Sequence, residues 1–282
     1  MSVFLSILLG LVQGVTEFLP VSSSGHLSIL QNIFAINYSE DEHFLFTVFL
    51  HLGTLISIIF VYKKEIQAMI SDGIAFLRMR SDSDSDEPVV MKPPARALLF
   101  VIVGTLPLLI ALIFMKSISR LFFSLGFIGF ALLVTGGLLY VSDKFITKGN
   151  KTEKTMTLGD ALIIGLAQAV AVIPGLSRSG TTIAVGLSRG LSGSYSVRFS
   201  LLLSIPAVFG ATIAALFNAI RSGINFAYLP AYLVGFVIAA VTGFFAIQFI
   251  RRIMSKGSFG KFAYYCWGIG VLTIILSLII RG

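Results

Sequence analysis

Charge is scarce in this sequence. Asp, Glu, Lys and Arg make up only 12% of its 282 residues, whereas soluble domains carry about 25%. The mean hydropathy is +0.94, and apolar runs of roughly 17–20 residues recur, long enough to cross a hydrocarbon core of about 30 Å as helices. The sequence therefore predicts an all-α polytopic membrane protein and excludes an ordinary soluble domain.

Cysteine is almost absent as well. Cys266 is the only one, so an internal disulfide is excluded and the redox compartment is left open. The N-terminal apolar run has no basic residues before it and leads into a polar motif instead of a small-residue cleavage site. We therefore expect no cleaved signal peptide.

Six apolar runs are expected to span the membrane as helices. They are 44–62, 97–115, 121–141, 199–217, 229–249 and 262–280. Lys and Arg gather in the predicted loops 63–96, 142–157 and 250–261, which the positive-inside rule places in the cytoplasm. This distribution accounts for the net charge of +8, so we expect no nucleic-acid partner. The polar, Pro-bounded stretch 78–96 is expected to be a cytoplasmic loop.

Two further apolar segments are broken by Pro and Gly. With the loop charges fixed as above, segment 158–198 starts and ends in the cytoplasm, and segment 1–43 starts and ends outside. Each is expected to be a re-entrant helical hairpin. Aligned at an offset of 155 residues, the stretches starting at Gly10 and Gly165 are identical at seven of 18 positions. One membrane domain is predicted, 1–282, with an inverted-topology repeat of about 1–141 and 158–282, and with a polar cavity where the two breaks meet.

Glu17 is the acidic residue that stands out, because nearly all of the 13 acidic residues fall in predicted loops and Glu17 falls in an apolar segment. An ionisable group at membrane depth is costly and is a functional candidate by default. Gln13 lies four residues earlier and shares a helical face with it. Their oxygens suit a hard divalent cation.

The two breaks carry polar clusters. "PVSSSGH" places Ser22, Ser23 and His26 after Pro20, where hydroxyls and a helix start can bind an anion and His26 can move a proton. "PGLSRSGTT" holds the only Lys or Arg of its broken apolar segment, Arg178, whose guanidinium can bind phosphate oxygens in a bidentate manner. With it come further candidates for a phosphate cradle: Ser177, Ser179 and Thr182.

Other polar residues favour structural roles. His51 is interpreted as a packed histidine within a span, and Asp160 as part of a helix start. Arg189 and Arg198 are expected to anchor the cytoplasmic face. The aromatic group Tyr264, Tyr265 and Trp267 is typical of an interfacial belt.

"QGVTEFLPVSSSGHL" and "PGLSRSGTT" resemble the two signature motifs of the undecaprenyl-diphosphate phosphatases of the bacitracin-resistance type, (E/Q)-x-x-x-E with P-x-S-S-x-G-H, and P-G-x-S-R-S-x-x-T. The resemblance covers essentially the whole chain. It implies removal of the terminal phosphate of undecaprenyl diphosphate, which recycles the carrier lipid of peptidoglycan synthesis and confers bacitracin resistance. It also implies dependence on Mg²⁺ or Ca²⁺. Many members have Glu where this chain has Gln13, which leaves Glu17 as the sole motif carboxylate.

The resulting hypothesis gives the catalytic roles to Glu17, Ser23, His26 and Arg178. Ser22, Ser177, Ser179 and Thr182 would bind the diphosphate with Arg178, and Glu17 and Gln13 would hold the cation. Ser23, or a water activated by His26, would attack the phosphorus.

The expected location is the bacterial plasma membrane, with the site open to the outer face. The expected partners are the polyprenyl diphosphate lipid and the bilayer, with a homodimer left open. The alternative function is a lipid-carrier flippase or secondary transporter, because inverted repeats with broken helices are typical of transporters.

Overall fold

A computed structural model describes residues 2–34, 40–82, 90–145, 149–222, 226–255 and 259–281, and within these ranges the chain forms helices and no named strand. The elements are α1 (Val3–Phe18), α2 (Ser23–Ile33), α3 (Glu40–Asp82), α4 (Pro93–Thr105), α5 (Leu108–Ile113), α6 (Met115–Leu121), α7 (Leu125–Ser142), η1 (Asp143–Phe145), α8 (Leu158–Val170), α9 (Arg178–Ser188), α10 (Gly193–Ser222), η2 (Phe226–Tyr228), α11 (Leu229–Ser255) and α12 (Lys261–Arg281).

The prediction of a polytopic all-α membrane protein is confirmed. Among the described residues, six helical stretches are long and apolar enough to cross a membrane. They are Leu45–Arg80, Pro93–Ile113, Leu125–Phe145, Gly193–Ala214, Leu229–Met254 and Lys261–Ile279. Each overlaps one of the six predicted spans.

The predicted loop 63–96 is wrong over much of its length. Helix α3 continues to Asp82 and α4 begins at Pro93, so both ends of the expected cytoplasmic loop 78–96 are helical, and residues 83–89 lie outside the described residues. The helix persists because apolar residues keep recurring three and four positions apart, as at Ile66, Ile70 and Ile74, with no proline to end it.

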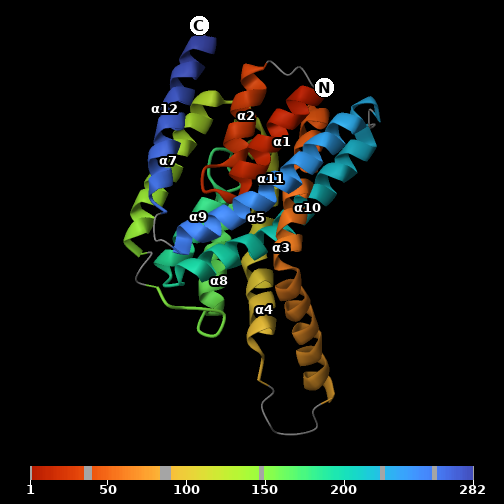
Figure 1. The fold of residues 1–282 in the computed structure, drawn as a ribbon, viewed down its shortest axis with the longest axis vertical. Helices are drawn as coiled ribbons and strands as arrows, with labels where there is room; N and C mark the ends of the chain where they lie inside the picture. Colours follow the sequence, from red (N-terminus) through yellow and green to blue (C-terminus); the bar gives the residue numbers. More distant parts are fainter. Residues whose placement is uncertain are drawn as a thin grey trace.

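The helices pack in pairs along an elongated molecule (Figure 1). Helix α7 runs beside α12, α1 lies along α11, and α3 packs against α11 and α10. The far ends of α3 and α4 project together at the lower end of Figure 1, and both chain termini lie at the upper end.

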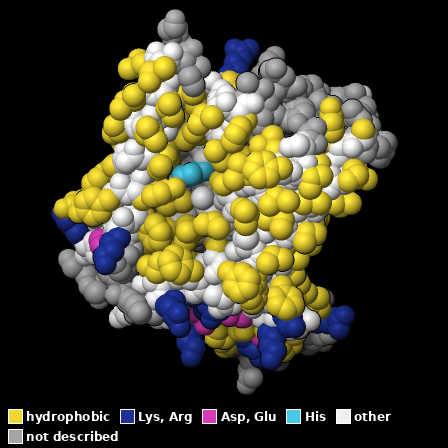
Figure 2. Space-filling model, turned by 45° about the horizontal axis from the view of Figure 1, so that its top comes forward, with side chains coloured by type: hydrophobic (Ala, Val, Ile, Leu, Met, Phe, Trp, Pro, Cys, Tyr) yellow, Lys and Arg dark blue, Asp and Glu magenta, His cyan; other side chains and the backbone are white. Residues whose placement is uncertain are grey.

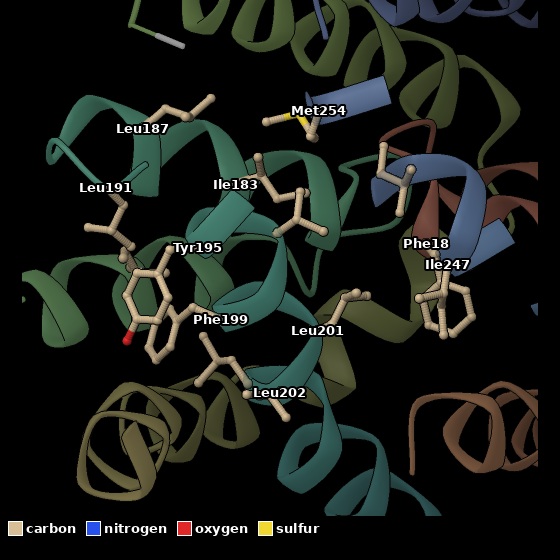
Figure 3. Packing of buried hydrophobic residues seen from close by; sticks show 14 of the residues in the cluster. Phe18, Ile183, Leu187, Leu191, Tyr195, Phe199, Leu201, Leu202, Ile247 and Met254 are labelled. Atoms are coloured by element: carbon tan, nitrogen blue, oxygen red, sulfur yellow. The ribbon is translucent and has the colours of Figure 1, made fainter. Parts of the chain in front are cut away.

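The largest core cluster joins both broken segments to the long helices. Figure 3 shows Phe18 of α1 beside Ile247 of α11 on one side of this cluster, and Leu187 and Tyr195 on the other. Phe18 has no exposed surface, so the end of α1 is fixed in a close-packed interior.

The helix is interrupted in both segments in which the sequence predicted a break, while their re-entrant course stays a prediction. Helix α1 ends at Phe18 and α2 starts at Ser23, while α8 ends at Val170 and α9 starts at Arg178. Each second helix has an equivalent N-cap: the hydroxyl of Ser22 accepts from Gly25 N at 3.2 Å, and that of Ser177 accepts from Gly180 N at 3.1 Å. Helices α1 and α2 both run to the upper end in Figure 1, whereas α8 starts near the lower end.

The two breaks contact each other reciprocally. A Cβ added at Gly25 would lie 3.3 Å from Gly175 Cα, and one added at Gly180 would lie 3.2 Å from Pro20 Cβ. Gly25 and Gly180 are equivalent at the offset of 155, and so are Pro20 and Gly175. Gly175 has a φ of +91°, which favours glycine at this close approach.

Helices α7 and α12 each contact one of the two breaks. Thr135 Oγ1 on α7 donates to Gly175 O at 3.1 Å, and Cys266 Sγ on α12 lies 3.6 Å from Pro20 O. Each broken segment also packs closely on a long helix through a glycine. Gly10 of α1 faces Gly235 O of α11. In the other half, Gly165 of α8 faces Gly104 O of α4.

Charged side chains gather at one end, which we call the basic end and define by Lys144, Lys151, Lys154, Arg189, Arg251 and Arg252. Figure 2 shows Lys and Arg side chains gathered along its lower edge, below a broad hydrophobic belt in which a histidine side chain is visible.

Asp160, which has no exposed surface, stabilises this end. It forms a capping box with Thr157 and ion pairs with Lys151 at 2.9 Å and Arg189 at 3.0 Å. Burial by itself would raise the pKa of Asp160, but these donors outweigh it and lower the pKa to about 2. The prediction of a helix start at Asp160 is thereby confirmed.

Candidate active site

The carboxylate of Glu17 is the centre of a polar cluster where the two breaks meet. Its side chain is only 5% exposed and lies one residue before the end of α1. A buried carboxylate is tolerable only when it is paired and hydrogen-bonded. Four side chains from four helices satisfy that requirement: Gln13 on α1, Ser23 on α2, His51 on α3 and Arg178 on α9.

Ser23 and Arg178 approach Glu17 from the starts of α2 and α9. Arg178 Nη2 forms an ion pair with Oε1 of Glu17, and Ser23 Oγ donates to Oε2 at 2.6 Å. Ser23 and Arg178 occupy equivalent positions in the aligned motifs, at the offset of 155. The two halves therefore deliver a hydroxyl and a guanidinium to opposite oxygens of one carboxylate.

Gln13 lies one helical turn before Glu17, as the spacing predicted. Its Nε2 donates to Glu17 Oε2 at 2.9 Å. Its Oε1 is buried and has no hydrogen-bond partner among the described residues. An orphaned amide oxygen next to a carboxylate is an arrangement that suits an added cation or water.

His26 does not contact Ser23 through a hydrogen bond. Its Nδ1 lies 2.8 Å from Ser22 O, which requires a proton on Nδ1, so neutral His26 accepts through Nε2 from Tyr265 OH at 2.9 Å. The two rings are stacked, with centroids 5.6 Å apart and an interplanar angle of 5°. Tyr265, which the sequence placed in an aromatic belt, therefore belongs to the site, and no pattern in its segment indicated this.

Ser22 has a φ of 69°, an uncommon conformation for a residue other than glycine. This turn directs its hydroxyl back as the α2 cap and its carbonyl toward His26. Strained backbone of this kind concentrates at functional sites.

The hydroxyls of the second motif are already engaged within the protein. Ser177 caps α9, Ser179 Oγ donates to Leu19 O at 3.1 Å, and Thr182 Oγ1 bonds to Arg178 O at 2.9 Å and to Ser200 Oγ at 2.6 Å. All three side chains are buried. These bonds hold the start of α9 and therefore Arg178 in place, and direct contact of these hydroxyls with a phosphate stays a prediction.

His51 is a site residue that the sequence reasoning missed. Its Nδ1 bonds to Thr47 O at 2.8 Å, and its Nε2 lies 3.6 Å from Glu17 Oε2. The available signal was its position in an apolar span, where an ionisable residue is a functional candidate by the rule applied to Glu17.

Two members of the cluster are partly exposed. Arg178 and His51 have side-chain exposures of 21% and 25%, whereas Glu17 is almost fully enclosed. An entering anion would therefore meet the cationic Arg178 before the carboxylate. Guanidinium, hydroxyl and carboxylate side by side can bind a phosphate, supply a nucleophile and accept a proton. The fold and the site define a helical integral membrane protein with a buried polar cluster at the meeting point of two broken helices.

Comparison with known proteins identifies the particular family. The family model of the bacitracin resistance protein BacA matches residues 6–272. An undecaprenyl-diphosphatase of Halothermothrix orenii is 38% identical over 279 residues, covering 98% of this chain and 99% of the relative. One from Methanobrevibacter smithii is 38% identical over 283 residues, covering 99% of both chains. This chain belongs to the BacA family.

Proposed function

We propose that the chain is an undecaprenyl-diphosphatase, a hydrolase that converts the C55 diphosphate lipid to its monophosphate and inorganic phosphate. The observation that carries the proposal is the shared carboxylate of Glu17, held by Arg178 from one break and Ser23 from the other. The family membership and the full-length similarity to undecaprenyl-diphosphatases support it.

Arg178 is the group that binds the terminal phosphate. It is partly exposed, cannot lose its charge, and is already paired with a carboxylate that a phosphate can replace. When the Arg178 guanidinium turns from Glu17 to the phosphate, Oε1 of Glu17 becomes free. Ser23 does not move, because it is bonded to the other oxygen of Glu17. Ser22, Ser177, Ser179 and Thr182 support this binding by fixing the two helix starts from which Ser23 and Arg178 extend.

Ser23 is the nucleophile and Glu17 its proton acceptor. The Ser23 hydroxyl is hydrogen-bonded to Glu17 and not to His26. As the bond from Ser23 Oγ to the terminal phosphorus forms, the bond from phosphorus to the bridging oxygen breaks, the lipid monophosphate leaves, and Glu17 takes the proton. Water then cleaves the phosphoserine, releasing inorganic phosphate, and Ser23 regains its proton from Glu17. His26 and Tyr265 position Ser22 and the start of α2 through the Nδ1 contact.

A divalent cation, Mg²⁺ or Ca²⁺, fits this site only together with the substrate. Among the described residues no group of three or more His, Cys, Asp and Glu could hold a metal ion. Glu17 and the unpartnered Oε1 of Gln13 would hold it, with phosphate oxygens and water as further ligands. The bound cation would neutralise charge on the phosphate oxygens.

Sidedness follows from the charges. If the basic end is cytoplasmic, the α1–α2 unit enters from the outer face and the α8–α9 unit from the cytoplasm, as re-entrant hairpins of an inverted repeat. The reciprocal contacts of Gly25 with Gly175 and of Gly180 with Pro20 support this arrangement. The site then opens to the outer face of the bacterial plasma membrane.

The test is phosphate release by purified protein from C15 and C55 diphosphates, with and without a chelator. We expect turnover of both, lost on chelation and restored by Mg²⁺ or Ca²⁺. Glu17→Gln preserves shape and Arg178→Lys preserves charge, and each should lower kcat/KM at least about a thousandfold, because the first removes the proton acceptor of Ser23 and the second removes the guanidinium that binds the terminal phosphate.

The control is Arg120→Ala, which removes an exposed arginine outside the site and should leave turnover unchanged. Normal turnover by either site variant would contradict its assigned role. A lipid-carrier transporter without hydrolysis would release no phosphate in detergent, so the same assay separates the two functions.

A further inference from the structure

A second cavity lies at the basic end, apart from the candidate active site. Its volume is about 1070 Å³, within the size range of ligand sites. It lies between α3, the segment around Glu153, the start of α10 and the last turns of α11. None of its lining residues belongs to the Glu17 cluster.

The carboxylates that line this cavity have ion-pair partners, whereas Arg251 has none among the described residues. Its two carboxylates, Glu65 and Glu153, both pair with Arg198, Glu65 at 3.8 Å and Glu153 in a short contact. Arg251 lies 5.7 Å from the ring centroid of Tyr62, and no ion pair of Arg251 is found in the described part of the chain. Arg251 therefore presents positive charge to the cavity, which the neighbouring Arg252 also lines.

The wall opposite the arginines offers donors. Ser192 caps α10 by accepting from Tyr195 N at 3.3 Å, and both residues line the cavity, so the positive end of the α10 dipole faces it. Tyr195 is only 3% exposed, and its hydroxyl has no hydrogen-bond partner among the described residues. In Figure 3 this hydroxyl points away from Leu191, at the margin of the core cluster. A buried, unpartnered hydroxyl at a helix start, in a cavity that Arg251 and Arg252 also line, suits an anion that hydrogen-bonds.

Part of the cavity lining is apolar and exposed. Phe245 and Phe249 line the cavity on α11, and they are 65% and 51% exposed. Both lie in the apolar stretch Leu229–Met254, whose exposed side chains face lipid. A ligand with an anionic head and a hydrocarbon tail can therefore place the head among the arginines and leave the tail against the phenylalanines.

We propose that this cavity is a second lipid site, which binds the phosphate head group of an anionic phospholipid at the basic end. Basic pockets between membrane helices on the cytoplasmic side bind such head groups. The proposal does not depend on the hydrolase activity, because it uses none of the residues of the candidate active site.

The experiment titrates phosphatidylglycerol and phosphatidylcholine of equal chain length into the full-length protein in neutral detergent. Bound lipid is counted by native mass spectrometry. We expect saturable binding of phosphatidylglycerol and at least tenfold weaker binding of phosphatidylcholine. Arg251→Gln with Arg252→Gln should weaken phosphatidylglycerol binding by about 30-fold, since each basic residue near an anionic head group contributes about fivefold.

The matched control is Lys144→Gln with Lys154→Gln, which removes the same charge from exposed positions at the same end, outside the cavity. Its binding should stay within about twofold of the parent. Equal losses in both double variants would show nonspecific attraction and overturn the proposal.

Tyr195→Phe separates a binding role from a structural one. It removes only an unpartnered hydroxyl, so it should leave the melting temperature unchanged or raised while weakening phosphatidylglycerol binding by about tenfold, the value of one hydrogen bond to a charged group. Unchanged binding by this variant would overturn the cavity's assignment.

Two further arms identify the ligand and its location. Arg178→Lys should bind phosphatidylglycerol like the parent, and loss of binding there would place the lipid in the Glu17 site and overturn the proposal. Glycerol phosphate should compete only at concentrations at least about a hundredfold higher than the lipid, because it lacks the tail. Equal competition would show a site for free phosphate and not for a lipid.

Discussion

At the scale of single residues, Glu17 organises the site because its two oxygens have different partners. Oε1 pairs with Arg178, while Oε2 receives the hydroxyl of Ser23 and the amide of Gln13. Replacing the Arg178 contact by a phosphate leaves the Ser23 contact intact. Binding of substrate and activation of the nucleophile are thus separable events on one side chain.

This division predicts the effect of Ser23→Ala. Since the proposed mechanism forms a bond to Ser23 Oγ, the variant should lose at least about a thousandfold in kcat with little change in KM. Phosphate release from the C15 diphosphate measures both constants.

Ser24→Ala is the matched control. Ser24 lies directly after Ser23, and its hydroxyl contacts only Ser22, at 3.3 Å, among the described residues. The loss of this hydroxyl should therefore lower kcat less than about tenfold. Retained turnover by Ser23→Ala would show that water attacks directly.

Motif spacing predicted part of this residue-scale picture. Gln13 and Glu17 share a helical face, and Arg178 was identified as the positive group of the second break. His51 and Tyr265 could not be found in this way, because α3 and α12 bring them to the site from 34 residues and 248 residues beyond Glu17 in the chain. Contacts at such separations depend on packing and leave no local pattern.

At the scale of elements, helices approach closely where glycine replaces a side chain. A Cβ at Gly165 of α8 would lie 2.3 Å from Gly104 O of α4, and one at Gly10 of α1 would lie 2.7 Å from Gly235 O of α11. These obstacles are backbone atoms, which cannot rotate away. Gly10 and Gly165, which are equivalent at the offset of 155, therefore each allow a broken helix to pack closely against a neighbouring helix.

Gly165→Ala should consequently destabilise the protein by about 1–3 kcal/mol, the usual cost of overpacking, and lower its apparent melting temperature by several degrees. Gly137→Ala is the control, because a Cβ at Gly137 meets no atom within 4 Å and alanine favours the helix by about 1 kcal/mol. Thermal unfolding in detergent gives both values. A stable Gly165→Ala variant would mean that α8 and α4 can separate without cost.

The positions of helices were easier to predict from sequence than their ends. Hydropathy identified all six spans, but α3 extends to Asp82, well past the predicted limit at residue 62. The amphipathic extension satisfies its backbone hydrogen bonds internally and continues as a helix after the apolar run ends. Hydropathy detects the apolar run, and this run ends before the helix does.

At the scale of the whole molecule, charged side chains are unevenly distributed, with many gathered along the lower edge of Figure 2. The basic end carries the second cavity and the Asp160 ion pairs, while the α1–α2 unit runs to the opposite end (Figures 1 and 2). The positive-inside rule turns this asymmetry into an orientation.

Single cysteines test that orientation. Lys154, at the basic end, and Arg120, between the second and third predicted spans, are exposed positions and are each replaced by cysteine. An impermeant maleimide should label Arg120→Cys in intact cells and Lys154→Cys only after permeabilisation. The parent protein is the control, since Cys266 is buried and should stay unlabelled. The reverse pattern would place the candidate site on the cytoplasmic side.

The sequence by itself determined the membrane environment, the six spans, the two breaks and the motif residues, because these follow from local composition and spacing. Only the tertiary structure decided which groups share the Glu17 carboxylate, that His26 faces Tyr265, and that the hydroxyls of Ser177, Ser179 and Thr182 face inward. The physical reason is that a hydrogen bond needs atoms within about 3 Å and a suitable angle. Such geometry is set by how distant helices pack, and residue order alone does not encode it in any local pattern.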